Sequence, residues 1–144
     1  MPKPNLISGA AFKDQRGTLH FFNQFSMADI VRFYEIHPAD TNIIRGWQGH
    51  GEEEKWFYCI KGECIINLIQ VDDFKNPNEN SVATKYVLSE SDFGMLHVPG
   101  GYATAFRAME PDTKVQVFSN FTLDESKNDD FRYPLEYWSA NWEK

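Results

Sequence analysis

Polar and apolar residues along this chain form short runs with the period of two that is typical of β-strands. Turn-forming residues separate many of these runs. There are eight: RFYEIH (32–37), TNIIRGW (41–47), KWFYCI (55–60), ECIINLIQV (63–71), SVATKYVL (81–88), MLHVP (95–99), YATAFRAM (102–109) and KVQVFSNF (114–121). Short strands at this spacing predict an all-β sandwich or barrel.

Helical periodicity is weak throughout the chain. Only SMADIVRF (26–33) and LDESKND (123–129) are expected to form a short helical turn. The segment 72–81 is rich in Asp, Asn and Pro, so we expect a surface loop between two antiparallel strands. The aromatic-rich C-terminus suits docking better than a central strand. We therefore expect residues 125–144 to dock on the barrel or on a partner subunit.

Composition narrows the class of protein. A chain of 144 residues predicts one domain, residues 1–144, with a core that needs neither metals nor disulfides. The formal charge of -7 argues against nucleic-acid binding, which depends on clustered Lys and Arg. No apolar run approaches the length of a membrane span, and the first ten residues lack the apolar core of a secretory signal. We expect a cytoplasmic protein without a membrane partner.

The two cysteines have two interpretations. If Lys61-Gly62 is a two-residue hairpin loop, Cys59 and Cys64 face each other on neighbouring strands, where a disulfide is geometrically conceivable. In a reducing cytosol we favour two small buried apolar residues without a function.

Candidate chemistry gathers in residues 45–63. Arg45 lies at a strand start, Gln48 and His50 are two residues apart and share one face, and Lys55 opens the next strand. These side chains can therefore share one pocket. The alternatives are a surface-turn role for His50 and a salt bridge between Lys55 and one of the glutamates in 52–54.

Four segments in this order resemble a known enzyme superfamily: FKDQRGTL (12–19), IIRGWQGH (43–50), EKWFYCIKGE (54–63) and LHVPGGYATAF (96–106). They are similar to cupin-type dTDP-4-keto-6-deoxyhexose 3,5-epimerases and dTDP-sugar 3,4-ketoisomerases. The resemblance implies a cupin jelly roll with its pocket in the barrel mouth. An acidic, aromatic-rich chain with strand edges to protect is also expected to pair as a homodimer.

The resemblance implies a nucleotide-linked 4-keto-6-deoxy sugar as substrate and no cofactor. In these families a base removes a proton next to the ketone, and a cation stabilises the enolate. His50 would be the proton shuttle, Lys55 and Arg45 would stabilise the enolate, and Arg16 would bind the diphosphate. Arg16 and Arg45 have an alternative as structural ion-pair partners of Asp14 or Asp29.

Other residues receive secondary roles. Gln48 stands where the epimerases have their catalytic histidine, so it is expected to contact substrate without acting as a base. His97 is either a hydrogen-bonded sheet histidine or a reserve base. Tyr102 either bonds the sugar or caps the barrel mouth.

Departures from the family pattern keep a second function open. Thr104 replaces a histidine, and residues 118–121 lack the tyrosine that serves as acid in epimerases. A non-catalytic sugar or sugar-nucleotide binding cupin is therefore the alternative. The usual cupin metal positions hold Gln48, His50, Lys55 and Thr104, so the sequence predicts no metal site.

Overall fold

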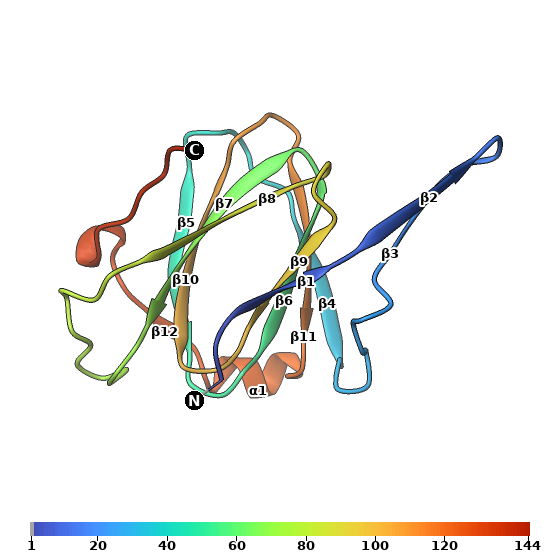
Figure 1. Ribbon diagram of the computed structural model, residues 1–144. Helices are drawn as coiled ribbons and strands as arrows, with labels where there is room; N and C mark the ends of the chain where they lie inside the picture. Colours follow the sequence, from blue (N-terminus) through green and yellow to red (C-terminus); the bar gives the residue numbers. More distant parts are fainter. Residues whose placement is uncertain (1) are drawn as a thin grey trace.

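The computed structural model describes residues 2–144, which form two five-stranded antiparallel sheets that face each other. The first sheet has the order β1-β9-β6-β11-β4, and the second has the order β12-β5-β10-β7-β8 (Figure 1). A separate hairpin, β2-β3, projects from one side of this barrel. Two facing antiparallel sheets are the architecture expected of a jelly roll.

The elements are short. The first sheet contains β1 (Asn5–Ser8), β9 (Gly94–Val98), β6 (Lys55–Lys61), β11 (Lys114–Ser119) and β4 (Arg32–Ile36). The second contains β12 (Phe131–Arg132), β5 (Ile44–His50), β10 (Tyr102–Ala108), β7 (Glu63–Gln70) and β8 (Thr84–Ser89). The hairpin consists of β2 (Ala10–Asp14) and β3 (Gly17–Phe21), and the chain adds one helix, α1 (Leu123–Lys127), and one 3-10 turn, η1 (Leu135–Tyr137).

All eight predicted strands are confirmed, as β4 to β11. The helical turn predicted after Thr122 is also confirmed, because Thr122 and Glu125 form a capping box at the start of α1. The helical turn predicted at 26–33 is wrong, since this segment is irregular and then enters β4. Among residues 2–144, no helix is long and apolar enough to cross a membrane.

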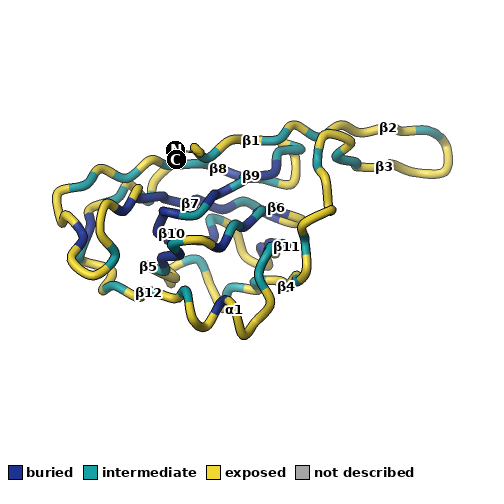
Figure 2. The backbone as a smooth tube through the Cα atoms, turned by 90° about the horizontal axis from the view of Figure 1, so that it is seen from below, coloured by how far each residue is buried: buried dark blue, intermediate teal, exposed yellow. Residues whose placement is uncertain are grey.

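The main core lies between the two sheets (Figure 2). β6 contributes Phe57 and Cys59, and β7 contributes Cys64, Ile66 and Leu68. These residues alternate with others along each strand because successive side chains point to opposite faces. The barrel is therefore filled from both sheets.

The outer face of the second sheet is covered as well. Ile69 of β7 packs there in a second cluster with Trp47 and Trp138, whose rings meet edge to face at 5.4 Å. Trp47 Nε1 donates to the carbonyl of Leu135, which ties the C-terminal segment to β5. β7 is thus buried on both faces, which explains why CIINLI is apolar at every position except Asn67 instead of alternating.

The turn at Lys61-Gly62 is not a hairpin, because it carries the chain from the first sheet to the second. Cys59 and Cys64 are therefore not ladder partners, and the hairpin premise is wrong. Both cysteines are free and buried, as the favoured interpretation predicted. Contact with the Cys59 thiol and burial raise the pKa of Cys64 well above its ordinary value.

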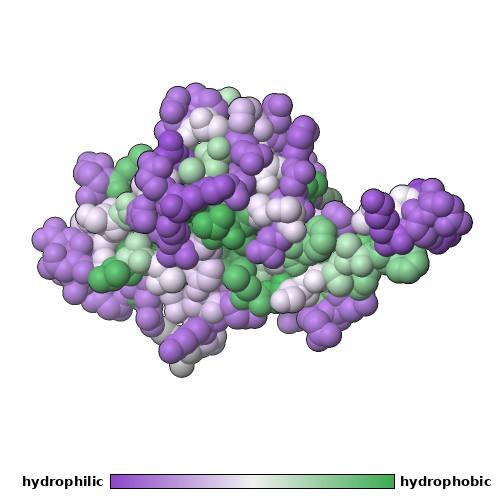
Figure 3. Space-filling view, turned by 45° about the horizontal axis from the view of Figure 1, so that its top comes forward, coloured by the Kyte–Doolittle hydropathy of each residue, from purple (hydrophilic) through white to green (hydrophobic). Residues whose placement is uncertain are grey.

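The β2-β3 hairpin forms an arm that stands away from the barrel (Figure 1). Its apolar side chains Phe12 and Leu19 are 55% and 65% exposed. In Figure 3, apolar surface continues from the body of the molecule onto the arm, and the tip is polar. Exposed apolar residues grouped in this way commonly mark an interaction surface.

A substitution at Gly62 tests how tightly the turn between the two sheets is packed. Its φ of +80° disfavours any L side chain, and an added Cβ would collide with Thr113 Oγ1. We expect Gly62→Ala to lower the free energy of unfolding by about 2 kcal/mol or more in a denaturant titration. Gly17→Ala is the control, because Gly17 has a φ of +131° but open space around its Cβ position. An equal loss of the free energy of unfolding in the two variants would contradict tight packing of the turn at Gly62.

Candidate functional site

A cavity opens between the two sheets at the edge formed by β4 and β5. Its inner part, of about 290 Å³, includes Ile36, Phe57 and Phe106 in its wall. Its outer part, of about 520 Å³, extends to α1 and β12. Both parts share the side chains of Tyr34, Arg45, Gln48, Lys55 and Arg132. They therefore form one site that runs from an apolar interior to a charged mouth.

A bulge in β5 turns the side chains of both Arg45 and Gln48 toward the cavity. Arg45 and Gln48 are three positions apart, so regular alternation would send them to opposite faces of the sheet. The register between β5 and β10 shifts at Ala105, beside Gly46, which has a φ of +148°. A Cβ on Gly46 would lie 2.6 Å from the Cβ of Ala105, so only glycine fits this bulge. Arg45 and Gln48 consequently both line the cavity.

The cavity is rich in positive charge although the chain carries a net charge of -7. Its wall includes five cations and one carboxylate: Arg32, Arg45, Lys55, Lys127, Arg132 and Asp130. Arg132 Nε is bonded to Asp130 at 2.9 Å. Within residues 2–144, neither Arg45 nor Lys127 has a side-chain hydrogen bond or ion pair. Unpaired guanidinium and ammonium groups at a cavity mouth suit a phosphate ligand.

Lys55 is 5% exposed, and within the described chain it makes no salt bridge. The alternative of an ion pair with residues 52–54 is therefore not formed. Its Nζ donates to Gln48 Oε1 at 3.4 Å and lies 5.7 Å from the centre of the Tyr34 ring. Gln48 Nε2 in turn donates to Asp130 Oδ1 at 3.2 Å. The ammonium group is thus free to meet negative charge on a ligand.

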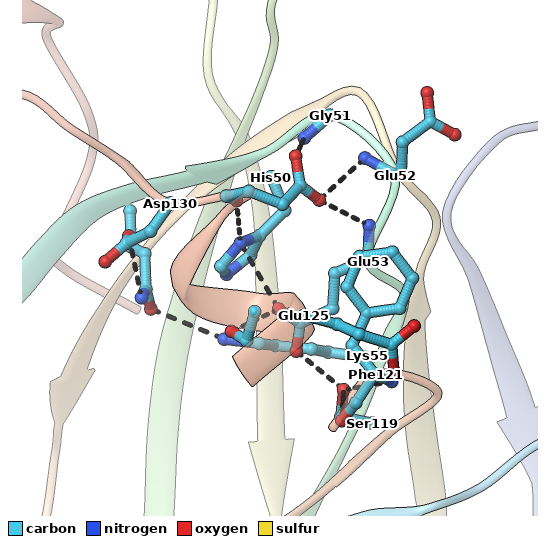
Figure 4. Close-up of polar contacts among 12 residues, drawn as sticks. His50, Gly51, Glu52, Glu53, Lys55, Ser119, Phe121, Glu125 and Asp130 are labelled. Atoms are coloured by element: carbon cyan, nitrogen blue, oxygen red, sulfur yellow. Dashed lines mark hydrogen bonds and ion pairs between the residues drawn. The ribbon is translucent and has the colours of Figure 1, made fainter. Parts of the chain in front are cut away.

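His50 is buried beside this cavity, although it does not line it (Figure 4). Its Nδ1 donates to the backbone carbonyl of Asp129 at 2.7 Å, which leaves the lone pair on Nε2. Nε2 is buried and has no hydrogen-bond partner within residues 2–144. Burial, followed by the positive charge of Lys55, lowers the pKa of His50. The imidazole is therefore held neutral, in the form that can accept a proton.

Glu53 lies behind His50 and is 2% exposed. It accepts hydrogen bonds from Ser119 and Ser126 at 2.6 Å each and from Arg32 at 2.8 Å. Burial favours the neutral carboxyl, but these hydroxyl bonds and the charge of Lys55 outweigh it and lower the pKa of Glu53. His50 Nδ1 is 3.4 Å from Glu53 Oε1.

Asp129 fixes the loop between β5 and β6. Its carboxylate accepts from the backbone N–H groups of Gly51, Glu52 and Glu53 at 2.8 to 2.9 Å (Figure 4). Its carbonyl accepts from His50, as described above. One residue of the C-terminal segment thus sets both the loop and the histidine tautomer.

Three of the predicted site residues meet in the cavity, namely Arg45, Gln48 and Lys55. Arg16 lies at the tip of the arm, where it is paired with Asp14 at 2.6 Å and 79% exposed. Among residues 2–144, no residue of the arm lines this cavity. In the single chain Arg16 is therefore an ion-pair partner of Asp14, which was the alternative to a role in binding the diphosphate.

His97 and Tyr102 also lie apart from this cavity. His97 stacks on Trp56 with ring centres 4.7 Å apart, and its nitrogens contact Glu54 at 2.7 Å and Asn5 at 3.1 Å. This is the arrangement expected of a hydrogen-bonded sheet histidine. Tyr102 belongs to the main core and borders a different cavity of about 310 Å³, together with Lys3 and other residues.

Sequence reasoning missed several residues of the site. Arg32 and Tyr34 alternate along a predicted strand, and that alternation was the available signal for their common face. Arg132 and Asp130 carry no such signal, because they reach the cavity only through the pairing of β12 with β5. Asp129 carries none either, because it meets the loop after β5 only in the folded chain.

The residues of the cavity do not suit a metal ion. Within residues 2–144, no group of three or more His, Cys, Asp or Glu side chains is arranged to hold one. The wall of the cavity offers one carboxylate among several cations. The absence of a metal or cofactor stays a prediction.

The buried His50 and Glu53 predict how stability depends on pH. Because the pKa of His50 is lower in the folded state than its ordinary 6.5, the unfolded chain binds the proton better. The contribution of neutral His50 to the free energy of unfolding is fully present above pH 6.5. It is lost as the pH falls through the lower pKa that His50 has in the folded state. Glu53 acts in the same direction below its ordinary 4.5. We expect the free energy of unfolding to fall between pH 7 and 5, and His50→Gln to flatten this slope in denaturant titrations. An unchanged slope in the variant would contradict a buried neutral histidine.

Comparison with known proteins gives the fold independently. A variant of the 3,4-ketoisomerase from Thermoanaerobacterium thermosaccharolyticum is 20% identical, with 92% of this chain and 89% of that chain covered and a TM-score of 0.71. The TDP-quinovose 3,4-ketoisomerase from Campylobacter jejuni is 21% identical, with 95% and 98% covered and a TM-score of 0.69. The dTDP-4-dehydrorhamnose 3,5-epimerase from Bacillus anthracis is 18% identical, with 96% and 84% covered and a TM-score of 0.75.

These likenesses confirm the cupin-type jelly roll that the resemblance implied. A comparison with curated protein sequences finds no match. The family model described as FdtA, WxcM-like, C-terminal, matches residues 3–139. Since this match spans nearly the whole chain, the protein belongs to the WxcM-like, C-terminal (FdtA) family.

Proposed function

We propose that the protein isomerises or epimerises a nucleotide-linked 4-keto-6-deoxy sugar through an enolate, in deoxysugar or polysaccharide biosynthesis. The observation that carries the proposal is a cavity with unpaired cations beside a buried histidine whose Nε2 is free. Similar proteins support the ligand class. The Thermoanaerobacterium ketoisomerase variant is in complex with TDP-4-keto-6-deoxyglucose, and the Bacillus epimerase has TDP and pyrophosphate bound.

The proposed chemistry begins at the ketone on sugar carbon 4, which acidifies the neighbouring C–H bonds. Lys55 and Arg45 donate to the ketone oxygen as it becomes an enolate oxygen, where their charges stabilise the transition state more than the ground state. In epimerisation, a proton returns to the opposite face of the same carbon. In ketoisomerisation, the hydroxyl proton on oxygen 3 passes to oxygen 4 and a proton is added at carbon 4, so that the ketone moves to carbon 3.

His50 is the proposed proton acceptor. Its Nδ1–H is engaged by Asp129, so Nε2 is the basic atom, and the lowered pKa keeps it unprotonated at neutral pH. Gln48 lies two residues earlier on the same strand and lines the cavity, whereas His50 does not. Proton transfer from the sugar therefore requires Gln48 to move aside, or to hold a water molecule that connects the two.

A second function, a non-catalytic sugar or sugar-nucleotide binding protein, is favoured by the same Gln48. An amide cannot act as a base at neutral pH, and here it stands in the cavity while the histidine stands behind it. In this alternative the cations bind the ligand and no proton leaves the sugar.

Deuterium exchange separates the two functions. The protein is incubated with TDP-4-keto-6-deoxyglucose in deuterated water, and label at sugar carbons 3, 4 and 5 is followed by NMR. We expect enzyme-dependent label, a loss of about 10²- to 10⁴-fold in His50→Ala, and a loss of about 10²- to 10³-fold in Lys55→Met. Lys114→Met, on an exposed strand position, is the matched control.

Gln48→His adds a diagnostic outcome. If the protein only binds its ligand, the wild type gives no label and Gln48→His gains exchange, because a base then lines the cavity. Unchanged exchange in His50→Ala would remove His50 from the mechanism. Absence of both binding and exchange would mean a different substrate.

We also propose a homodimer in which the arm reaches a second copy. Phe12 and Leu19 expose apolar surface on the arm, and Arg16 at its tip is remote from the cavity of its own chain. Pairing of two chains would cover the apolar surface and could bring Arg16 to the diphosphate in the partner's cavity. A cytoplasmic location remains part of the proposal, supported by the two free cysteines.

The dimer is tested by light scattering and by mixing variants. We expect a mass about twice the 16.7 kDa of one chain, and a monomer for Leu19→Asp but not for the control Val82→Asp. Arg16→Ala and Arg132→Ala should each weaken TDP binding, because Arg132 is a cation of the cavity wall without a role at the ketone. When the two variants are mixed and reassembled, about a quarter of the chains should regain a complete site, since half of the dimers are mixed and each has one. No regained binding would contradict a shared site.

A further inference from the structure

A second cavity, of about 310 Å³, borders the inner face of the second sheet. It lies on the side of the edge strands β1 and β8, whereas the candidate functional site lies on the side of β4 and β5 (Figure 2). The two cavities share no wall residue. A volume near 300 Å³ is at the small end of the range for small-molecule sites. The second cavity is therefore a separate candidate site for a small ligand.

Three neighbouring strands bring polar side chains to this cavity. Tyr102 of β10 lies opposite Gln70 of β7, and Leu68 of β7 lies opposite Thr84 of β8. Tyr86 is two positions after Thr84, so its side chain points to the same face of the sheet. All five residues border the cavity. Two phenols and one threonine hydroxyl thus reach the same space.

The two phenols have no partners inside the protein. Tyr102 is 8% exposed, and within residues 2–144 neither its hydroxyl nor that of Tyr86 has a hydrogen-bond partner. The Tyr102 hydroxyl is also not one of the fully enclosed polar atoms of the described chain, so it opens on the cavity. A buried phenol normally finds a partner, as Tyr133 does at the carbonyl of Phe74. Two unpaired phenols at one cavity therefore suit a ligand that accepts hydrogen bonds.

The charge of the wall favours an anion. Among the described residues, the wall contains one cation, Lys3, and no carboxylate. Burial raises the pKa of Tyr102, so its phenol stays protonated at neutral pH and can donate. Phenol and ammonium groups form strong, charge-assisted hydrogen bonds to an oxyanion. Pro4, Leu68 and Val82 add apolar wall, which an inorganic anion would leave uncovered. A carboxylate attached to an apolar group matches both parts.

We propose that this cavity binds a small carboxylate that has a compact apolar body. The hydroxyls of Tyr102 and Tyr86 donate to the carboxylate oxygens, and the exposed Lys3 contributes positive charge at the cavity mouth. The apolar body lies against Leu68 and Val82. Because no residue of the candidate functional site takes part, this site is independent of the proposed function.

Titration followed by NMR tests the class of ligand. The full-length, isotope-labelled protein is titrated with isovalerate and with benzoate, and separately with isovaleramide and benzamide, which have similar shapes but no charge. We expect the two carboxylates to shift the backbone N–H signals of residues 68–70, 84–86 and 102, with a Kd on the order of 1 mM. The two neutral amides should bind at least about 10-fold more weakly.

Removal of single hydroxyl groups tests the contacts. Tyr102→Phe and Tyr86→Phe should each weaken isovalerate binding by about 10-fold or more, because each variant loses one hydrogen bond to a charged group. Tyr133→Phe is the matched control and should bind isovalerate as the wild type does, since its hydroxyl lies away from this cavity. Thermal unfolding should give the opposite order. Tyr102→Phe should keep the melting temperature within about 2 °C of the wild type, whereas Tyr133→Phe should lower it, because only Tyr133→Phe leaves a carbonyl unpaired.

Lys55→Met separates this cavity from the candidate functional site. If Lys55→Met loses isovalerate binding and Tyr102→Phe keeps it, the carboxylate lies at the cations of the candidate site and the proposal is wrong. Equal binding of the carboxylates and their amides would contradict the ligand class, and the absence of shifts with both carboxylates would contradict the site. An equal loss of melting temperature in Tyr102→Phe and Tyr133→Phe would mean that the Tyr102 hydroxyl has a partner inside the protein. TDP binding is measured on the same samples, so each of these failures leaves the proposed function standing.

Discussion

The buried carboxylate of Glu53 joins four elements of this protein at the candidate site. Its partners are Arg32 on β4, Ser119 on β11, Ser126 on α1 and, at 3.4 Å, His50 on β5. A buried negative charge is strongly unfavourable unless hydrogen-bond donors and positive charge surround it. Satisfying this one group therefore requires both sheets and the C-terminal segment to meet at one place.

The C-terminal segment then completes the wall of the cavity. Asp129 binds three backbone N–H groups of the loop after β5, and Asp130 contacts Gln48. These bonds hold β12 against β5, so that Arg132 reaches the cavity. The site is consequently made from two parts of the chain that are about eighty residues apart, and polar contacts join them at the site.

The electrostatics of the site follow from placement and not from composition. The chain is acidic overall, but the bulge at Gly46 turns Arg45 inward, and Lys55 is buried without a salt bridge in the described chain. In a cavity partly shielded from water, such charges act on a ligand more strongly than they would at the surface. An acidic protein can in this way contain a local site for an anion, with Gln48 held between Lys55 and Asp130.

Local patterns in the sequence determined the eight strands from β4 to β11 and the capped start of α1, and they singled out Arg45, Gln48 and Lys55 as candidates for one pocket. Alternation, turn residues and capping residues act between near neighbours, so they can be read without the fold. The same patterns did not tell that Lys61-Gly62 crosses between sheets, because a turn does not specify which strands pair. Only the tertiary structure decided that His50 is buried without lining the cavity, that Arg16 is remote from the cavity of its own chain, and that the bulge at Gly46 and the pairing of β12 bring Arg45 and Arg132 into that cavity. The physical reason is that these positions depend on pairing and on burial of charge between segments far apart in the chain.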